Sequence, residues 1–276
     1  VATFSILGDM AARIGGEHIA LTTIVGPDGD THVHQPTPAD ARAVSEAEVL
    51  IVNGLDFEGW LDRLVEAAEF DGRRVVATEA IDPIPFEAGD HNGHGHDHDH
   101  DDHAEGGHHG HDHGAFDPHA WQSPRLAVGY VDTITAALAT ADPANATAFY
   151  ENRAAYVAEI EALDAEIRDM IAALPEDRRT VVTSHDAFQY FARDYGLTFL
   201  SPQGLSTESE ASAKDVARLI EQMRAENISA VFVENITDPR LIEQIASETG
   251  ATIGGTLYPG ALSGPDGPAP TYLDMM

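Results

Sequence analysis

The stretch "PANATAFYENRAAYVAEIEALDAEIRDMIAALP" (residues 143–175) contains the longest helical pattern in the sequence. Its apolar residues recur at spacings of three, four and seven: Phe149, Tyr156, Ile160, Leu163, Ile167 and Ile171. Asp142 and Pro143 suit the cap and the first turn of such a helix. About thirty residues at ~1.5 Å each predict a rod of roughly 45 Å. A coiled-coil helix would show a similar pattern, but the flanking segments favour a strut between two domains.

Strands and helices alternate before this helix. Short apolar runs that end at Gly, Pro or polar residues predict strands, and they are "LTTIV" (21–25), "EVLIVNG" (48–54) and "RRVVAT" (73–78). Helical patterns lie between them, in "TPADARAVSEA" (37–47) and "FEGWLDRLVEAAEF" (57–70). This βαβα order predicts a parallel sheet covered by helices.

The same alternation follows the long helix. We predict strands at 178–184, 228–235 and 251–257, and helices at 185–196, 213–227 and 238–250. The predicted fold class is therefore α/β, with two similar lobes built on parallel sheets and joined by one long rigid helix. The lobes are expected at 1–141 and 176–276, with the linking helix at 142–175.

The composition limits the function. With 47 acidic and 15 basic residues the net charge is −32, which excludes a broad attraction to nucleic acid or anionic lipid. The absence of cysteine excludes disulfides and thiolate metal sites, so any metal must be held by nitrogen and oxygen. No apolar run reaches the ~18 to 20 residues of a membrane span. The opening residues also lack a signal peptide, so we expect either a cytosolic protein or one whose targeting segment has been removed.

The tract "HNGHGHDHDHDDHAEGGHHGHDH" (91–113) holds ten of the fifteen histidines. Residues 90–114 lack the apolar area that would offset the entropy of ordering, so we predict a mobile loop. This loop is a candidate for secondary, weaker metal binding through its histidines: His91, His94, His96, His98, His100, His103, His108, His109, His111 and His113.

The other five histidines occur singly or as a pair. His32 follows the strand at 21–25, His119 lies in "FDPHAW" after the tract, and His185 lies where the strand at 178–184 meets a helix. Ligands of α/β proteins bind outside the C-terminal ends of the strands, and imidazole is a common zinc ligand. His34 is close enough to His32 to share a metal ion, whereas His18 is expected at the surface.

Four segments carry a resemblance to a known family: "GDTHVHQPTPADARAV", "FDPHAWQSP", "TSHDAFQYFARDYGL" and "LSGPDGPAPTYLDMM". In this order they resemble segments of the zinc/manganese-specific solute-binding proteins of bacterial ABC transporters, the ZnuA/TroA/AztC-like group. The similarity extends over essentially the whole chain. It implies a single metal ion in the cleft between the lobes, with ligands at His32, His119 and His185. His34 matches a position where the family often has an aromatic residue.

The resemblance also implies a function. We expect a periplasmic, monomeric protein whose signal peptide is absent from this sequence. It would capture Zn²⁺ and deliver it to a membrane-embedded ABC permease, and indirectly to the ATPase of that permease. An acidic His-rich insertion marks the zinc-importing members, so the loop is expected to assist zinc acquisition. A periplasmic metallochaperone is a further candidate partner. No catalytic or organic-cofactor site is predicted.

One position departs from the family. The usual fourth ligand is an aspartate, but Gly260 occupies its place in "YPGALSGPDGP". Asp266 is a conceivable substitute, although we favour water or an exogenous anion. Glycine also predicts a looser turn at 258–266 than in relatives. A histidine as third ligand, where manganese-binding members often have glutamate, favours zinc, as do three imidazoles together.

Two other functions remain open at this stage. Three histidines and a bound water also form the site of zinc hydrolases, and some relatives are described as metal-dependent adhesins. Glu210 and Glu234 are candidates for orienting an imidazole through its second nitrogen. Either could equally be a surface or capping carboxylate.

Overall fold

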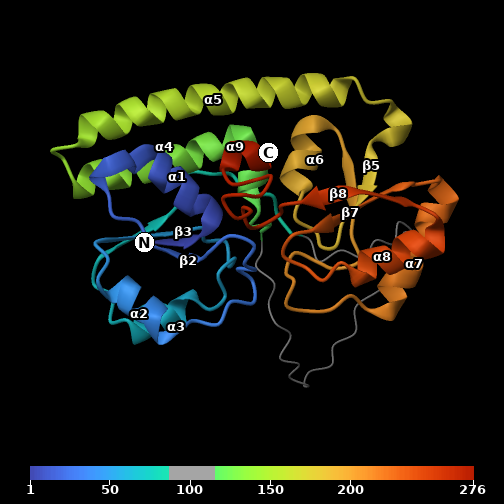
Figure 1. Ribbon diagram of the computed structural model, residues 1–276, viewed down its shortest axis with the longest axis horizontal. Coiled ribbons are helices and arrows are strands. Elements are labelled where there is room, and N and C mark those ends of the chain that lie inside the picture. The colour runs from blue at the N-terminus through green and yellow to red at the C-terminus, as the bar shows by residue number, and fades with distance from the viewer. Residues whose placement is uncertain (87–115) are drawn as a thin grey trace, which may run out of the picture.

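Two lobes lie side by side beneath one long helix in the computed structural model (Figure 1). The structure describes residues 1–86 and 116–276, so the predicted loop at 90–114 and its ten histidines lie outside the described residues. Each lobe is built on a four-stranded sheet in which every strand pair is parallel. The fold class predicted from the sequence is confirmed.

The first sheet has the strand order β2-β1-β3-β4. Its strands are β1 (Ala2–Phe4), β2 (Thr23–Val25), β3 (Val49–Val52) and β4 (Arg73–Val76). All four residues of β3 are buried, as expected for a parallel strand covered on both faces. Figure 1 shows α1 (Ser5–Gly15) and α4 (Pro124–Ala141) on one side of this sheet, and α2 (Pro38–Ser45) and α3 (Leu61–Ala67) on the other.

The second sheet repeats this arrangement with the order β6-β5-β7-β8. Its strands are β5 (Thr180–Val182), β6 (Thr198–Leu200), β7 (Ala230–Glu234) and β8 (Thr252–Leu257). They are accompanied by α6 (Gln189–Tyr195), α7 (Ala213–Glu226) and α8 (Arg240–Thr249). Val182, Val231, Ile242 and Ile245 form the centre of a separate apolar core.

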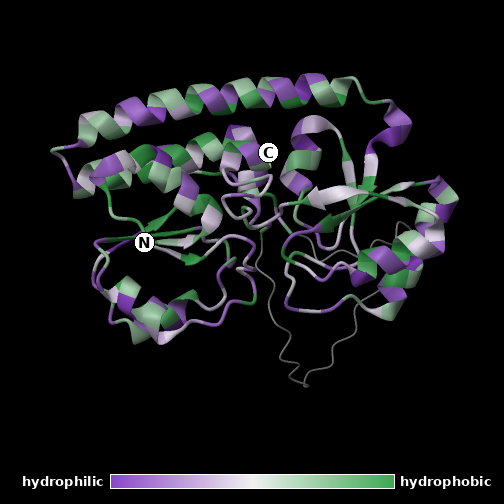
Figure 2. Ribbon diagram, viewed as in Figure 1, coloured by the Kyte–Doolittle hydropathy of each residue, from purple (hydrophilic) through white to green (hydrophobic). Residues whose placement is uncertain are grey.

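Helix α5 (Ala146–Ala172) is the predicted strut. Its 27 residues correspond to a rod of roughly 40 Å at ~1.5 Å per residue. It packs on α1 and α4 and also contacts α6 of the second lobe. Phe149, Tyr156, Ile160 and Ile167 are buried as predicted, while Leu163 and Ile171 are half-buried. Figure 2 shows polar and apolar residues alternating along α5, as an amphipathic helix requires.

The predicted helix boundaries need correction at two places. Helix α5 begins after Asn145, because Asp142 accepts a hydrogen bond from the Asn145 side chain (2.6 Å) before the helix starts. Helix α6 begins at Gln189 instead of residue 185. The backbone N–H groups of His185 and Asp186 are directed to Glu234 and to the Gly204 carbonyl, which holds this segment in a bend.

Helix α4 is the largest element that the sequence patterns missed. Its buried residues, including Ala127, Tyr130, Val131 and Ile134, recur at helical spacings on one face. Arg125 and Asp132 are the only charged residues among its 18, so the opposite face is weakly polar and the amphipathic pattern is hard to recognise. The strands β1 and β6, of three residues each, were also missed.

The C-terminal segment returns to the first lobe. The sequence patterns grouped residues 176–276 in one lobe, yet Leu262 and Tyr272 belong to the apolar core of the first. Helix α9 (Tyr272–Met275) is fixed there by a hydrogen bond from the Tyr272 N–H to the Asp9 carboxylate (2.9 Å). Short 3₁₀ turns η1 (Gly16–His18), η2 (Ala120–Gln122) and η3 (Glu176–Arg178) complete the described elements.

None of the helices within 1–86 and 116–276 is long and apolar enough to cross a membrane.

Candidate metal centre

Three histidines from separate parts of the chain meet where the lobes face each other. His32 lies in the loop between β2 and α2, His119 directly precedes η2, and His185 follows β5. In each sheet the second strand lies on one side of the first and the later strands lie on the other, so the strand order reverses between β1 and β3 and between β5 and β7. Crevices at such reversal points, outside the C-terminal ends of strands, are the usual ligand sites of open α/β sheets.

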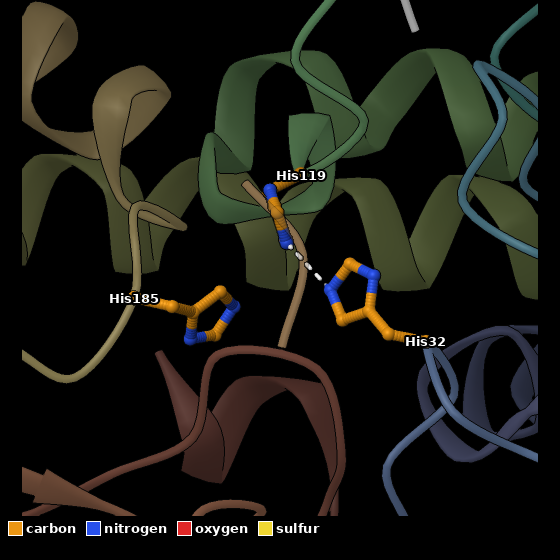
Figure 3. A group of neighbouring side chains, drawn as sticks. All are labelled: His32, His119 and His185. Carbon is orange, nitrogen blue, oxygen red and sulfur yellow. Dashed lines mark hydrogen bonds between the residues drawn. The ribbon is translucent and has the colours of Figure 1, made fainter. Parts of the chain in front are cut away.

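The candidate ligand atoms of these histidines lie within 4.8 Å of one another. Figure 3 shows the three rings around a common centre, with the Nε2 atoms of His32 and His119 3.3 Å apart. Zinc–nitrogen bonds of ~2.0–2.1 Å in a tetrahedron place neighbouring ligand nitrogens about 3.4 Å apart. The His32–His119 pair therefore already has the separation that one shared zinc ion requires.

In two of the three rings a carboxylate binds the Nδ1 nitrogen. His119 Nδ1 lies 2.8 Å from Asp117 Oδ1, and His185 Nδ1 lies 2.6 Å from Glu234 Oε2. Each carboxylate retains the proton on Nδ1, which leaves Nε2 as the free lone pair. His185 Nε2 is buried and has no hydrogen-bond partner among the residues that the structure describes. A buried nitrogen without a partner is costly unless a ligand satisfies it.

Backbone hydrogen bonds fix the same carboxylates. Asp117 Oδ1 also accepts the His119 N–H (2.9 Å), and Glu234 Oε1 accepts the N–H groups of Ser184 (2.9 Å) and His185 (3.1 Å). Asp30 Oδ1 accepts the N–H of His32 (3.0 Å) in the same way. A carboxylate thus binds the backbone N–H of each of the three histidines, and for His119 and His185 the same carboxylate also binds the ring.

Burial sets the protonation of two rings. It lowers the pKa of His32 and of His119 well below 6.5, and the neighbouring histidines lower both further. His185 differs: burial lowers its pKa, but the Glu234 carboxylate outweighs that effect, so the pKa is raised above 6.5. At neutral pH His32 and His119 are neutral, which is the form that binds metal.

The turn that contains Gly260 lies beside this cluster. A Cβ at Gly260 would meet Ile236 Cδ1 at 3.5 Å and Phe57 Cζ at 3.9 Å, both ordinary contacts. Phe57 packs edge-on against His32, with ring centroids 4.7 Å apart. Position 260 therefore has room for a side chain close to the three rings.

Part of this turn is fixed by contacts with the rest of the protein. Residues 259–263 are buried. The Pro259 carbonyl accepts hydrogen bonds from Trp121 Nε1 and Gln122 Nε2, both 2.9 Å. The Leu262 N–H and carbonyl also bind the first lobe, at Ser5 and Asp28. The conformational freedom expected from a glycine at 260 is removed by these tertiary contacts.

A cavity of about 750 Å³ opens beside His32. Its lining includes Trp60, Phe116 and Leu205. Phe116 and the neighbouring Val33 are apolar yet 39% and 46% exposed, so this opening is bordered by exposed apolar groups. The cavity provides a route from solvent to His32.

The remaining predicted residues lie outside the cluster. His34 Nε2 is 3.3 Å from Asp40, and its ring packs on Trp60, so it is not brought to the other three histidines. His18 is exposed, as expected. Of the two carboxylates considered for orienting an imidazole, Glu234 does so, whereas Glu210 is exposed. Asp266 is also exposed and is not in the cluster.

The sequence patterns did not identify Asp117 and Asp30. A signal was present, because each aspartate stands two residues before a candidate ligand: "DTH" (30–32) and "DPH" (117–119). An aspartate commonly accepts the N–H of the residue two positions later. Burial raises the pKa of Asp117 to about 7.

Comparisons with known proteins identify the family of this chain. The family described as "Zinc-uptake complex component A periplasmic" (ZnuA) matches residues 1–276. The chain belongs to this ZnuA/TroA family of metal-binding periplasmic solute-binding proteins. It is therefore an ABC-transporter solute-binding protein and not an enzyme, so the hydrolase alternative is set aside.

Individual relatives differ in the metal that they are named for. The iron-binding protein YfeA of Yersinia pestis is 33% identical over 276 residues, covering 100% of this chain and 82% of that protein. The manganese-binding lipoprotein MntA of Halalkalibacterium halodurans is 32% identical, covering 100% of this chain and 84% of that protein.

Two solved structures match over nearly the whole chain, each covering 99% of it and 93% of the other chain. The periplasmic zinc-binding protein TroA of Treponema pallidum superposes with a TM-score of 0.84 at 26% identity. A manganese-bound periplasmic metal-binding protein of Candidatus Liberibacter asiaticus has a TM-score of 0.81 at 30% identity. Family membership thus establishes a divalent-metal carrier outside the cytoplasm without selecting the metal.

Proposed function

We propose that His32, His119 and His185 form the primary site of a zinc carrier, which captures Zn²⁺ and passes it to an ABC permease for import. The observation that supports zinc is the composition of the cluster: within the described parts of the chain, it contains three imidazoles and no carboxylate. Imidazole suits the borderline-soft zinc ion, whereas manganese prefers oxygen ligands.

The placement of the nearby carboxylates supports the same choice. Asp117 and Glu234 bind the Nδ1 atoms of His119 and His185 instead of facing the Nε2 centre. They make the imidazoles better donors without adding a hard oxygen ligand to the metal. Three neutral nitrogens and an exchangeable fourth ligand describe a zinc site better than a manganese site.

The His-rich tract has an accessory role in this proposal. Its ten histidines between 91 and 113 offer many exchangeable ligand sets, which bind zinc weakly but quickly. Such an array would raise the local supply of zinc, and the net charge of −32 favours a cation as the partner. Loading by a periplasmic metallochaperone and a monomeric state remain part of the same proposal. Nothing in residues 1–86 and 116–276 favours the adhesin alternative.

The test compares metals on one protein. The metal-free chain is titrated with Zn²⁺, Mn²⁺ and Fe²⁺ in competition with chelators of known affinity. We expect one zinc ion to bind at least a hundredfold more tightly than manganese. His32→Ala should abolish this tight binding, and the matched control His34→Ala should retain it, because His34 is bound to Asp40. Tighter binding of manganese or iron than of zinc would refute the zinc assignment.

A further inference from the structure

In the segment Asp117, Pro118, His119, the carbonyl groups of Asp117 and Pro118 accept hydrogen bonds from two buried side chains. Asn53 Nδ2 donates a hydrogen bond to the Pro118 carbonyl (3.0 Å), and the Tyr190 hydroxyl donates one to the Asp117 carbonyl (2.7 Å). Asn53 and Tyr190 are both 0% exposed. These contacts are separate from the Asp117 side chain, which binds the His119 ring.

The two hydrogen-bond donors, Asn53 and Tyr190, come from different lobes. Asn53 directly follows β3 of the first sheet, whereas Tyr190 lies in α6 of the second lobe, five residues after His185. The Tyr190 hydroxyl also accepts the Ile84 N–H (3.0 Å), so both of its partners belong to the first lobe. The buried hydroxyl of Tyr190 thus links α6, which follows His185, to the segment that carries His119.

The contacts around Tyr190 fix its partners, its protonation and its ring. Ile84 and Asp117 are joined by a backbone hydrogen bond (2.9 Å), so the two partners of Tyr190 form one unit. Burial raises the pKa of the Tyr190 phenol to about 12, so the hydroxyl keeps its proton and remains a donor at neutral pH. The Arg193 guanidinium lies 5.3 Å from the centre of the Tyr190 ring and covers it.

The segment needs such support because it lacks regular structure. Pro118 has no backbone N–H, and His119 lies outside any strand or α-helix before η2 begins. The direction of the His119 ring therefore depends on where its neighbouring carbonyls are fixed. The Nε2 atoms of His32 and His119 must remain about 3.4 Å apart to share a zinc ion, so a small displacement of the segment would weaken binding.

We propose that Tyr190 is a positioning residue for metal binding: its hydroxyl fixes the Asp117–His119 segment and couples the place of His119 to that of His185 across the two lobes. This inference rests on the proposed function, because it assumes that one metal ion is shared by these histidines. It predicts that loss of one hydroxyl group, remote from the metal, changes the geometry of the bound metal.

The experiment uses Tyr190→Phe in the full chain, with Tyr195→Phe as the matched control. Tyr195 lies on the same helix, and its hydroxyl donates to Asp164 on α5, away from the histidines (2.7 Å). Both variants lose one hydroxyl; Tyr190→Phe thereby loses two hydrogen bonds and Tyr195→Phe loses one. The loss of about 1 to 3 kcal/mol is small against typical stabilities of about 5 to 15 kcal/mol, so both should fold. Zinc affinity is measured by chelator competition, metal geometry by the visible spectrum of bound Co²⁺, and stability by thermal unfolding without metal.

We expect Tyr190→Phe to weaken zinc binding ~10-fold, at the lower end of the range for residues that orient metal ligands, and to change the Co²⁺ spectrum. Tyr195→Phe should lower the unfolding temperature without either effect. An unchanged affinity and spectrum in Tyr190→Phe, with only a lower unfolding temperature, would overturn the inference. If the wild-type chain itself binds neither zinc nor cobalt tightly, it is the proposed function that fails.

Discussion

Restoring a carboxylate at position 260 should tighten zinc binding. In Gly260→Asp the new Cβ would make only ordinary contacts with Ile236 and Phe57. The backbone at Gly260 does not have a positive φ, so an L side chain meets no strain there. The turn is held by Trp121 and Gln122, and the ring of Trp121 packs 5.3 Å from that of His119, so position 260 stays close to the cluster.

The size of the effect follows from the change in ligand set. Removal of residues that merely orient metal ligands costs ~10 to 100-fold in affinity. A carboxylate that binds the metal itself, and supplies the cluster's first negative charge, should gain at least ~10-fold, or about 1.4 kcal/mol. Without metal, the same carboxylate would be buried and unpaired, because residues 259–263 are buried. The unfolding temperature should therefore fall in the metal-free variant and rise in the zinc-loaded one.

The assay is competition with a zinc chelator, supported by thermal unfolding with and without zinc. Gly260→Asn is the matched control, because it has the same shape and no charge and should gain much less. If Gly260→Asp changes the zinc affinity by less than about threefold, position 260 does not complete the site. The fourth ligand would then have to come from elsewhere.

Three further outcomes are expected. Glu234→Gln should weaken zinc binding ~10 to 100-fold, because the amide does not retain the Nδ1 proton of His185 as a carboxylate does. A zinc affinity that changes only twofold in chelator competition would contradict this role of Glu234. Zinc affinity should fall about tenfold per pH unit below the raised pKa of His185, because one proton must leave its Nε2 for each zinc ion bound. The pKa values of His32 and His119 are lowered, so protons do not compete with zinc for those two rings in this range. A zinc affinity that is flat from pH 8 to pH 6 would show that His185 is not a ligand. Deletion of residues 90–114 should leave one tightly bound zinc ion but slow its loading at limiting zinc, and stopped-flow rates equal to those of the intact chain would argue against a capture role.

Much of this architecture could be predicted from local sequence patterns. The apolar spacing between Phe149 and Ile167 predicts α5, and the short apolar runs before and after it predict most of the strands. Among the candidate ligands, His32 and His185 stood out because each follows a predicted strand, and His119 because it follows the His-rich tract; the family resemblance implied all three as ligands. Even the unrecognised roles of Asp30 and Asp117 were visible as a repeated Asp-x-His spacing, since that contact is made within three residues.

The tertiary structure decided what depends on residues far apart in the chain. Glu234 orients His185 from 49 positions away, and Tyr190 reaches Asp117 from 73 positions away. No local pattern encodes such pairs, because they exist only once β5 and β7 lie side by side and α6 packs against the first lobe. The turn at Gly260 shows the same limit: glycine by itself predicts freedom, but hydrogen bonds from Trp121 and Gln122, more than 130 positions earlier, remove it. The residue types and their spacing thus determined the candidate donors and the two-lobe plan. Tertiary packing determined the 3.3 Å approach of His32 and His119 and the protonation of the three rings, because these depend on burial and on contacts between residues far apart in the chain.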